Sequence, residues 1–132
     1  MDISVINYLS VLVAAVGGFV FGAVYYGLVS KQWQAAGRIA PEQARPGATI
    51  LIVTFVAELI MAFVLAGVIG GSMTSGVVPG MIVAFYVWLG FMVTTMAVNH
   101  RYQAYGWNLT LIDGVHWLGV ALIMGAIIGW WS

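Results

Sequence analysis

One acidic residue lies in the middle of a long apolar segment of the sequence. Glu58 is the tenth residue of the segment 49–69, and Thr54 and Ala62 lie one helical turn to either side of it. A charge at the centre of a bilayer costs about 2.5–3.5 kcal/mol, so such an acid is protonated, paired with a buried partner or placed beside water. We therefore predict that Glu58 is a protonatable group that faces neighbouring helices.

A second acidic residue shares a helix face with a histidine. Asp113 and His116 are three residues apart, a spacing that puts both side chains on the same face of a helix. The same face continues through Ala121 and Gly125, which are small residues typical of helix contacts in membranes. The pair therefore has two interpretations. It handles protons or ions, or it anchors one end of the helix at the membrane surface.

Further polar residues are expected in the cytoplasmic half of the same bundle. They are Tyr25, Tyr26, Thr94, Thr95 and Asn99. We predict that Tyr26, Thr95 and Asn99 join Glu58, Asp113 and His116 around one polar cleft that opens to the cytoplasm. The alternative is a purely structural network in which neutral Glu58 is hydrogen-bonded to Asn99 or Tyr26. His100 stands beside Arg101 in a predicted loop, and we expect its side chain to be solvated.

Other chemistries are poorly represented in the sequence. The chain has no cysteine, and its few histidines and acids lie at different depths, whereas a metal site needs three or four ligands together. We predict no metal and no cofactor. There is no nucleophile motif of a hydrolase, so we expect the protein not to be an enzyme. The net charge is zero without any basic run, which argues against nucleic acid as a partner.

The elements that carry these side chains are long apolar segments. Charged residues make up 6% of the sequence, whereas soluble domains contain about 25%. Segments 4–29, 49–69, 77–99 and 110–130 each reach the roughly 20 apolar residues that cross a bilayer as a helix. They lack the alternating pattern of barrel strands. We predict an all-α, polytopic membrane protein, a four-transmembrane-helix bundle that forms a single domain over 1–132.

The basic residues predict the orientation of the chain. Lys31, Arg38 and Arg45 lie between the first and second segments, and Arg101 lies between the third and fourth. With four spans, these two loops share one face of the membrane. The positive-inside rule places loops 30–48 and 100–109 in the cytoplasm and both termini outside, in the periplasm. We expect a short interfacial helix within the first of these loops.

Small residues four apart predict how the helices pack. The rows are Ala14, Gly18 and Gly22; Gly76, Gly80 and Ala84; and Ala121, Gly125 and Gly129. In lipid, such rows let helix backbones approach closely. We expect them to hold this bundle together. Whether one row also serves a homo-oligomer or a larger membrane complex stays open at this stage.

Several short motifs, taken together in order, resemble those of a known family. They are Asn7-Tyr8-Leu9, Gly22-Ala23-Val24-Tyr25-Tyr26-Gly27, Lys31-Gln32-Trp33, Thr94-Thr95 followed by Asn99, and Leu111-Ile112-Asp113-Gly114-Val115-His116. The chain resembles the bacterial four-helix membrane proteins of the DUF1761 family of unknown function. One departure is that no proline follows Tyr26-Gly27. The resemblance implies four spans in a bacterial inner membrane, and it implies no activity.

Two hypotheses of function follow from the sequence. In the first, a multi-pass protein of the inner membrane binds or passes a small ion or solute, in a proton-linked manner, through the cleft centred on Glu58. In the second, the protein is a non-enzymatic accessory subunit that packs against a larger membrane complex. The lipid bilayer is a partner in both.

Overall fold

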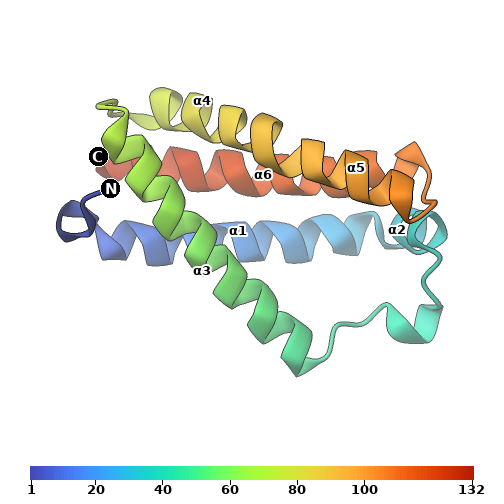
Figure 1. The fold of residues 1–132 in the computed structure, drawn as a ribbon. Helices are drawn as coiled ribbons and strands as arrows, with labels where there is room; N and C mark the ends of the chain where they lie inside the picture. Colours follow the sequence, from blue (N-terminus) through green and yellow to red (C-terminus); the bar gives the residue numbers. More distant parts are fainter.

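The four apolar segments of the sequence form four long helices, and the chain contains no strand. The computed structural model describes all residues from Met1 to Ser132. The spans are α1 (Tyr8–Leu28), α3 (Ala48–Gly71), the continuous helix Val77–Tyr102, and α6 (Trp107–Trp131). Figure 1 shows α1, α6 and the third span lying side by side, with α3 crossing them obliquely. The prediction of an all-α protein with four membrane-spanning helices is confirmed.

The first span begins four residues later than position 4, where the sequence predicted its start. Asp2 accepts hydrogen bonds from both the backbone N–H and the hydroxyl of Ser4, and residues Ile3–Val5 form a 3-10 turn, η1. These hydrogen bonds lower the pKa of the Asp2 carboxyl. The chain then enters α1 through Asn7, whose side-chain oxygen accepts from the N–H of Ser10 at 3.2 Å. An asparagine N-cap of this kind satisfies a free N–H at the helix start, and it fixes the boundary.

The third span contains a wider helical turn in its middle. It consists of α4 (Val77–Val87), the π-helical segment η3 (Trp88–Val93) and α5 (Thr94–Tyr102). The Thr94 hydroxyl donates to the Gly90 carbonyl at 2.9 Å, and the Thr95 hydroxyl donates to the Phe91 carbonyl at 2.6 Å. Side-chain hydroxyls satisfy backbone carbonyls in this way where a helix departs from regular geometry inside a membrane.

The closest backbone contact in the bundle lies between α4 and α6. A methyl group at Gly80 would clash with the Gly125 carbonyl, and one at Gly129 would clash with the Gly76 carbonyl. The N–H of Gly76 also donates to the Gly129 carbonyl at 2.9 Å, where Gly76 has a positive φ of 106°. The small-residue rows of these two helices therefore face each other, as expected for helix contacts in lipid.

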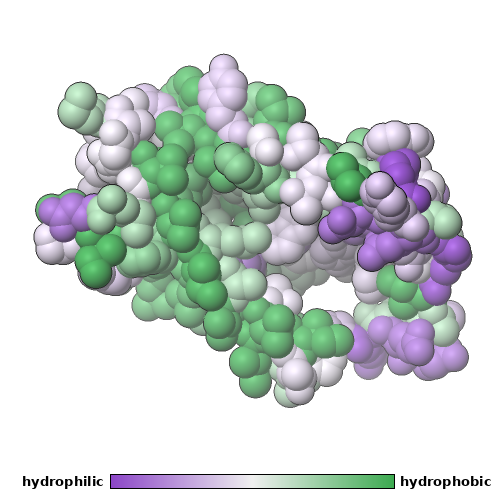
Figure 2. Space-filling view, in the orientation of Figure 1, coloured by the Kyte–Doolittle hydropathy of each residue, from purple (hydrophilic) through white to green (hydrophobic).

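The buried residues of α3 form a single stripe that begins at Glu58. The stripe continues through Ala62, Leu65 and Ile69, at helical spacing, and packs against α1 and α6. Residues 48–53 of α3 are all exposed, for example Ile52 at 64%, whereas Phe55 already packs against Phe19 of α1 with ring centres 5.7 Å apart. Figures 1 and 2 show this exposed start of α3 standing away from the other helices as an apolar arm. α3 thus leaves the bundle in the turn between Val53 and Glu58.

Hydrophilic side chains gather at one end of the molecule, which we call the basic end (Figure 2). It contains α2 (Ser30–Gly37), the 3-10 turn η2 (Pro41–Gln43) and the turn between α5 and α6. Arg38 has a left-handed backbone, with φ of 55°, and donates to the Ala104 carbonyl at 3.0 Å. The Arg101 guanidinium lies 3.6 Å from the centre of the Trp107 ring. The two predicted loops therefore meet through Arg38, whereas Arg101 holds the turn between α5 and α6.

Candidate functional site

Three polar side chains lie against three successive turns of one face of α1. Positions 18, 22 and 26 are one helical turn apart and therefore share this face. Glu58 of α3 lies against Gly18, and His116 of α6 lies against Gly22. The third, Asp113 of α6, accepts a hydrogen bond from the Tyr26 hydroxyl at 2.7 Å. We call Glu58, His116, Asp113 and Tyr26 the polar row.

Glu58 is the innermost member of the polar row, and its carboxyl group has few polar neighbours. The side chain is 1% exposed, and its Oε2 atom has no hydrogen-bond partner. Its Oε1 atom would lie 3.2 Å from a methyl group at Gly18, next to the apolar ends of Val120 and Met124. Glycine at position 18 therefore gives the carboxyl group its space. Buried polar groups normally find a partner, so an unpaired one needs a reason other than folding.

His116 occupies the next turn and is enclosed by aromatic rings. It is 5% exposed, and its ring centre lies 4.6 Å from that of Tyr26 and 4.6 Å from that of Trp117. The Tyr25 ring lies at 5.7 Å. The Nε2 atom faces Gly22, and the Nδ1 atom has no hydrogen-bond partner. His116 is thus held in place by packing, while its Nδ1 atom has no hydrogen-bond partner.

Asp113 connects the polar row to the basic end. One carboxyl oxygen, Oδ1, accepts from Tyr26, and the other, Oδ2, lies 3.8 Å from the Nε2 atom of His100 in α5. The neighbouring Tyr25 hydroxyl donates to the Ile112 carbonyl at 2.7 Å, which ties α1 to α6 beside the carboxyl group. On the other side of α6, the Trp88 indole N–H donates to the Gly114 carbonyl at 2.9 Å. The position of Asp113 is therefore fixed from both sides.

The structure brings together four of the six residues that the sequence selected. Glu58, Asp113, His116 and Tyr26 form the polar row, whereas Thr95 and Asn99 are exposed and do not approach it. The Thr95 hydroxyl is used instead on the carbonyl of Phe91 in η3. Neither hydrogen bond expected for Glu58 in a structural network, to Asn99 or to Tyr26, is present, since Tyr26 bonds to Asp113.

His100 is the residue that sequence reasoning misplaced. We expected it to be solvated in a loop, but it belongs to α5, and its side chain is 12% exposed. Its Nδ1 atom is 2.8 Å from the Thr110 hydroxyl. The prediction failed because α5 continues to Tyr102, so that His100 faces the first turns of α6 across a short connection. The sequence signal was the small number of residues between the third and fourth spans.

The glycines opposite the polar row were predicted for another role. Gly18 and Gly22 belong to a row that indicated close backbone packing, as occurs between α4 and α6. On α1 they accommodate a carboxyl group and an imidazole. Positions 18, 22 and 26 are four residues apart, and this spacing was the sequence signal that one face of α1 contacts all the side chains of the polar row. No group of three histidine or acidic side chains gathers into a metal-binding set.

The fold and this row define a class of protein, a small multi-pass membrane protein with a buried, unpaired acid. Residues 9–129 match the model of a family described as "Protein of unknown function (DUF1761)". The chain therefore belongs to the DUF1761 family, and the resemblance noted in its sequence motifs is confirmed. Comparison with curated proteins finds no match, and comparison with solved structures finds none either.

Proposed function

We propose that the protein binds and passes a proton, or a small ion or solute in exchange for a proton, with Glu58 as the protonatable centre. The observation that carries this proposal is the polar row. Three groups able to exchange protons lie one after another along α1, from Asp113 near the basic end to Glu58 within the membrane. In this proposal the protein is not an enzyme, and it needs no cofactor.

The unpaired atoms of the row support a role in binding. Glu58 Oε2 and His116 Nδ1 are both buried without a partner. Leaving a buried polar atom unpaired costs about 1–3 kcal/mol. An apolar side chain at either position would avoid this cost and pack equally well in lipid. Intramembrane acids that carry such a cost are typical of ion and proton pathways.

The place of Glu58 in the fold supports access to it. Glu58 is the first buried residue of α3, and it follows the exposed segment 48–53, which forms the arm, by little more than one helical turn. Figure 2 shows an open space between this arm and the basic end.

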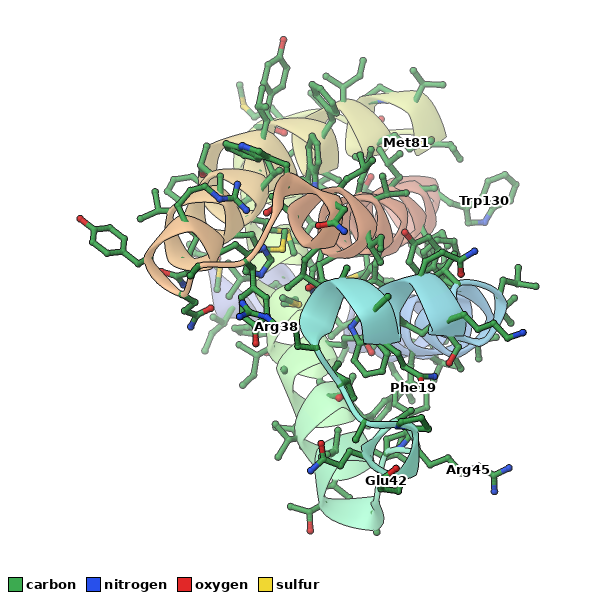
Figure 3. All side chains as sticks on the ribbon, turned by 90° about the vertical axis from the view of Figure 1, so that its right-hand side faces the viewer. Phe19, Arg38, Glu42, Arg45, Met81 and Trp130 are labelled. Atoms are coloured by element: carbon green, nitrogen blue, oxygen red, sulfur yellow. The ribbon has the colours of Figure 1, made fainter.

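The proposal includes an orientation. All four basic residues lie at the basic end, so we place this end in the cytoplasm and both termini in the periplasm of a bacterial inner membrane. Figure 3 views the molecule from this end, where Arg45 points away from the helices and Arg38 points toward the α5–α6 turn. The polar row would then open to the cytoplasm through Asp113.

Proton flux into proteoliposomes, measured with an enclosed pH-sensitive dye, tests this function. We expect Glu58→Gln to reduce the flux to that of empty liposomes while the protein stays folded. The matched control is Glu42→Gln, because Glu42 is exposed on η2 outside the row. Wild-type flux no greater than that of empty liposomes in any imposed gradient, or equal flux in wild type and Glu58→Gln, would remove the proposed role.

A second candidate function is that of an accessory subunit in a larger membrane complex, or of a protomer in a homo-oligomer. The apolar arm of α3 favours it, because its side chains are largely exposed: Ile50 by 59%, Ile52 by 64% and Val53 by 62%. Native mass spectrometry after gentle solubilisation distinguishes the candidates. A complex with a second protein would support the accessory role, and a single species would count against it.

A further inference from the structure

Beyond the polar row, a second group of side chains joins Asp113 to the surface of the basic end. His100 of α5 lies between Asp113 and Thr110 of α6, with its Nε2 atom 3.8 Å from Asp113 Oδ2 and its Nδ1 atom 2.8 Å from the Thr110 hydroxyl. The Nη2 atom of Arg101 donates to the same hydroxyl at 2.8 Å. Thr110 is buried, so its hydroxyl depends on these two partners.

The hydrogen bonds of this group determine which nitrogen of neutral His100 carries the proton. Arginine can only donate, so the Thr110 oxygen accepts from Arg101. The single hydrogen of that hydroxyl has one acceptor within reach, His100 Nδ1. Nδ1 therefore accepts, and the ring proton is on Nε2, where it faces Asp113. The carboxyl group favours the same arrangement, since an unprotonated Nε2 would direct its lone pair at Asp113 Oδ2.

The remaining charged and titratable groups around His100 leave this arrangement intact. On α5, Arg101 is held by stacking on Trp107 and by its bonds to the carbonyls of Tyr105 and Gly106. The Tyr105 ring lies 5.9 Å from the His100 ring, and the Arg38 guanidinium lies 4.3 Å from the Tyr105 ring centre. Asp113 is the one acidic group that His100 contacts.

We propose that His100 passes protons between the aqueous phase at the basic end and Asp113, and that Thr110 and Arg101 are its positioning residues. This inference rests on the proposed function, because it supplies the outer end of the pathway to Glu58. In the inward step, the Thr110 hydroxyl gives its proton to Nδ1 along the hydrogen bond between them and takes a proton from water in its place. The Nε2–H bond then breaks, and its proton forms an O–H bond with Asp113 Oδ2. One proton enters and one is passed on, so His100 ends neutral with its proton on Nδ1, and the ring returns to the Nε2–H form before the next transfer.

The tautomer gives a test that does not depend on flux. Nitrogen-15 NMR of the protein in lipid bilayers distinguishes Nδ1–H from Nε2–H, and His116→Gln identifies the signals of His100, since the chain has two histidines. We expect Nε2–H in the wild type. Thr110→Val has the same shape without the hydroxyl and should increase the share of Nδ1–H, because Asp113 alone then favours Nε2–H, whereas Thr110→Ser should keep the wild-type ratio. Mainly Nδ1–H in the wild type, or an unchanged tautomer ratio in Thr110→Val, would overturn the positioning role.

Flux measurements separate the failure of this inference from failure of the proposed function. We expect His100→Gln to reduce proton flux by roughly 100-fold, a size typical for loss of a proton-transfer group, and Thr110→Ser to retain most of the flux. Full flux in His100→Gln beside lost flux in Glu58→Gln would overturn the role of His100 alone. Full flux in both variants would overturn the proposed function and the relay with it.

Discussion

Gly22 of α1 and His116 of α6 are in direct contact, because a methyl group at Gly22 would lie 2.7 Å from the His116 Nε2 atom. The rings of Tyr26 and Trp117 enclose the imidazole on its other sides, so that it can move away only if they move too. The glycine therefore makes the space in which the histidine lies. Gly18 does the same for Glu58. Beside these two glycines, therefore, polar side chains fill the space that a neighbouring helix backbone fills at other glycine rows.

Replacing Gly22 by alanine should displace His116. We expect Gly22→Ala to destabilise the protein by about 1–3 kcal/mol, the usual cost of an overpacked contact. It should also reduce proton flux, because the imidazole would leave its place between Glu58 and Asp113. Reversible unfolding in mixed micelles measures the first effect, and proteoliposome flux measures the second.

The control for this substitution lies on the same helix. Gly27 has no atom within 4 Å of the position that a methyl group would take. Gly27→Ala should therefore leave both stability and flux close to those of the wild type. If Gly22→Ala were as stable as Gly27→Ala, the contact between Gly22 and His116 would not constrain the bundle.

Replacing Glu58 by leucine should separate function from stability. The buried Oε2 atom is unpaired, and leucine removes a polar group whose burial without a partner costs about 1–3 kcal/mol. We therefore expect Glu58→Leu to be at least as stable as the wild type and up to about 3 kcal/mol more stable, while losing all proton flux. Unfolding in mixed micelles, followed by the tryptophan signal, measures the difference.

A structural role for Glu58 makes the opposite prediction. If the carboxyl group held the helices together, Glu58→Leu would lower the free energy of unfolding. Glu42→Leu provides the reference, because Glu42 is exposed on η2 and its replacement should change stability little. A lower stability of Glu58→Leu relative to Glu42→Leu would show that the acid is part of the packing.

The number of spans and their approximate positions could be predicted from the sequence because they depend on the length of apolar segments, whereas their ends differ by up to four residues from those predicted. The depth of Glu58 within α3 follows from the same counting. The face that each helix turns inward is harder to predict. These helices are apolar all round, so hydropathy does not indicate the buried side. Thr95 and Asn99 were assigned to the site by depth alone, and the rotation of α5 about its axis places them outside.

Two further features were not predicted from the sequence. The π-helical turn η3 changes the rotation of α5 relative to α4, and no composition rule marks such a turn. The place of His100 depends on the length of α5 and on Thr110, which hydrogen-bonds to it from the next helix. Asp113 and His116 were found because a spacing of three residues fixes a common helix face without knowledge of the partners.

The hydroxyl of Thr95 should matter more than that of Thr54. Both donate to the carbonyl four residues earlier, Thr95 within the third span at η3 and Thr54 within the regular helix α3. We expect Thr95→Val to destabilise the protein by about 1 kcal/mol, the typical net value of a hydrogen bond. Thr54→Val should be close to neutral, because regular helical hydrogen bonds already satisfy its carbonyl partner. Unfolding in mixed micelles compares the two, and equal effects would mean that η3 does not depend on the hydroxyl.

Replacing Arg101 by lysine should loosen the turn between α5 and α6. One nitrogen of Arg101, Nη2, donates to the carbonyls of Tyr105 and Gly106 and to the Thr110 hydroxyl, while the guanidinium stacks on Trp107. Lysine keeps the charge but loses the planar group and its fixed donors. We expect faster amide hydrogen exchange in residues 103–109, measured by mass spectrometry, and a loss of about 1.5–3 kcal/mol of stability, the range for hydrogen bonds to a charged group.

Arg45→Lys is the matched control, because Arg45 points away from the bundle and forms no hydrogen bond (Figure 3). Equal exchange in the two variants would mean that charge alone, and not the geometry of the guanidinium, holds the turn.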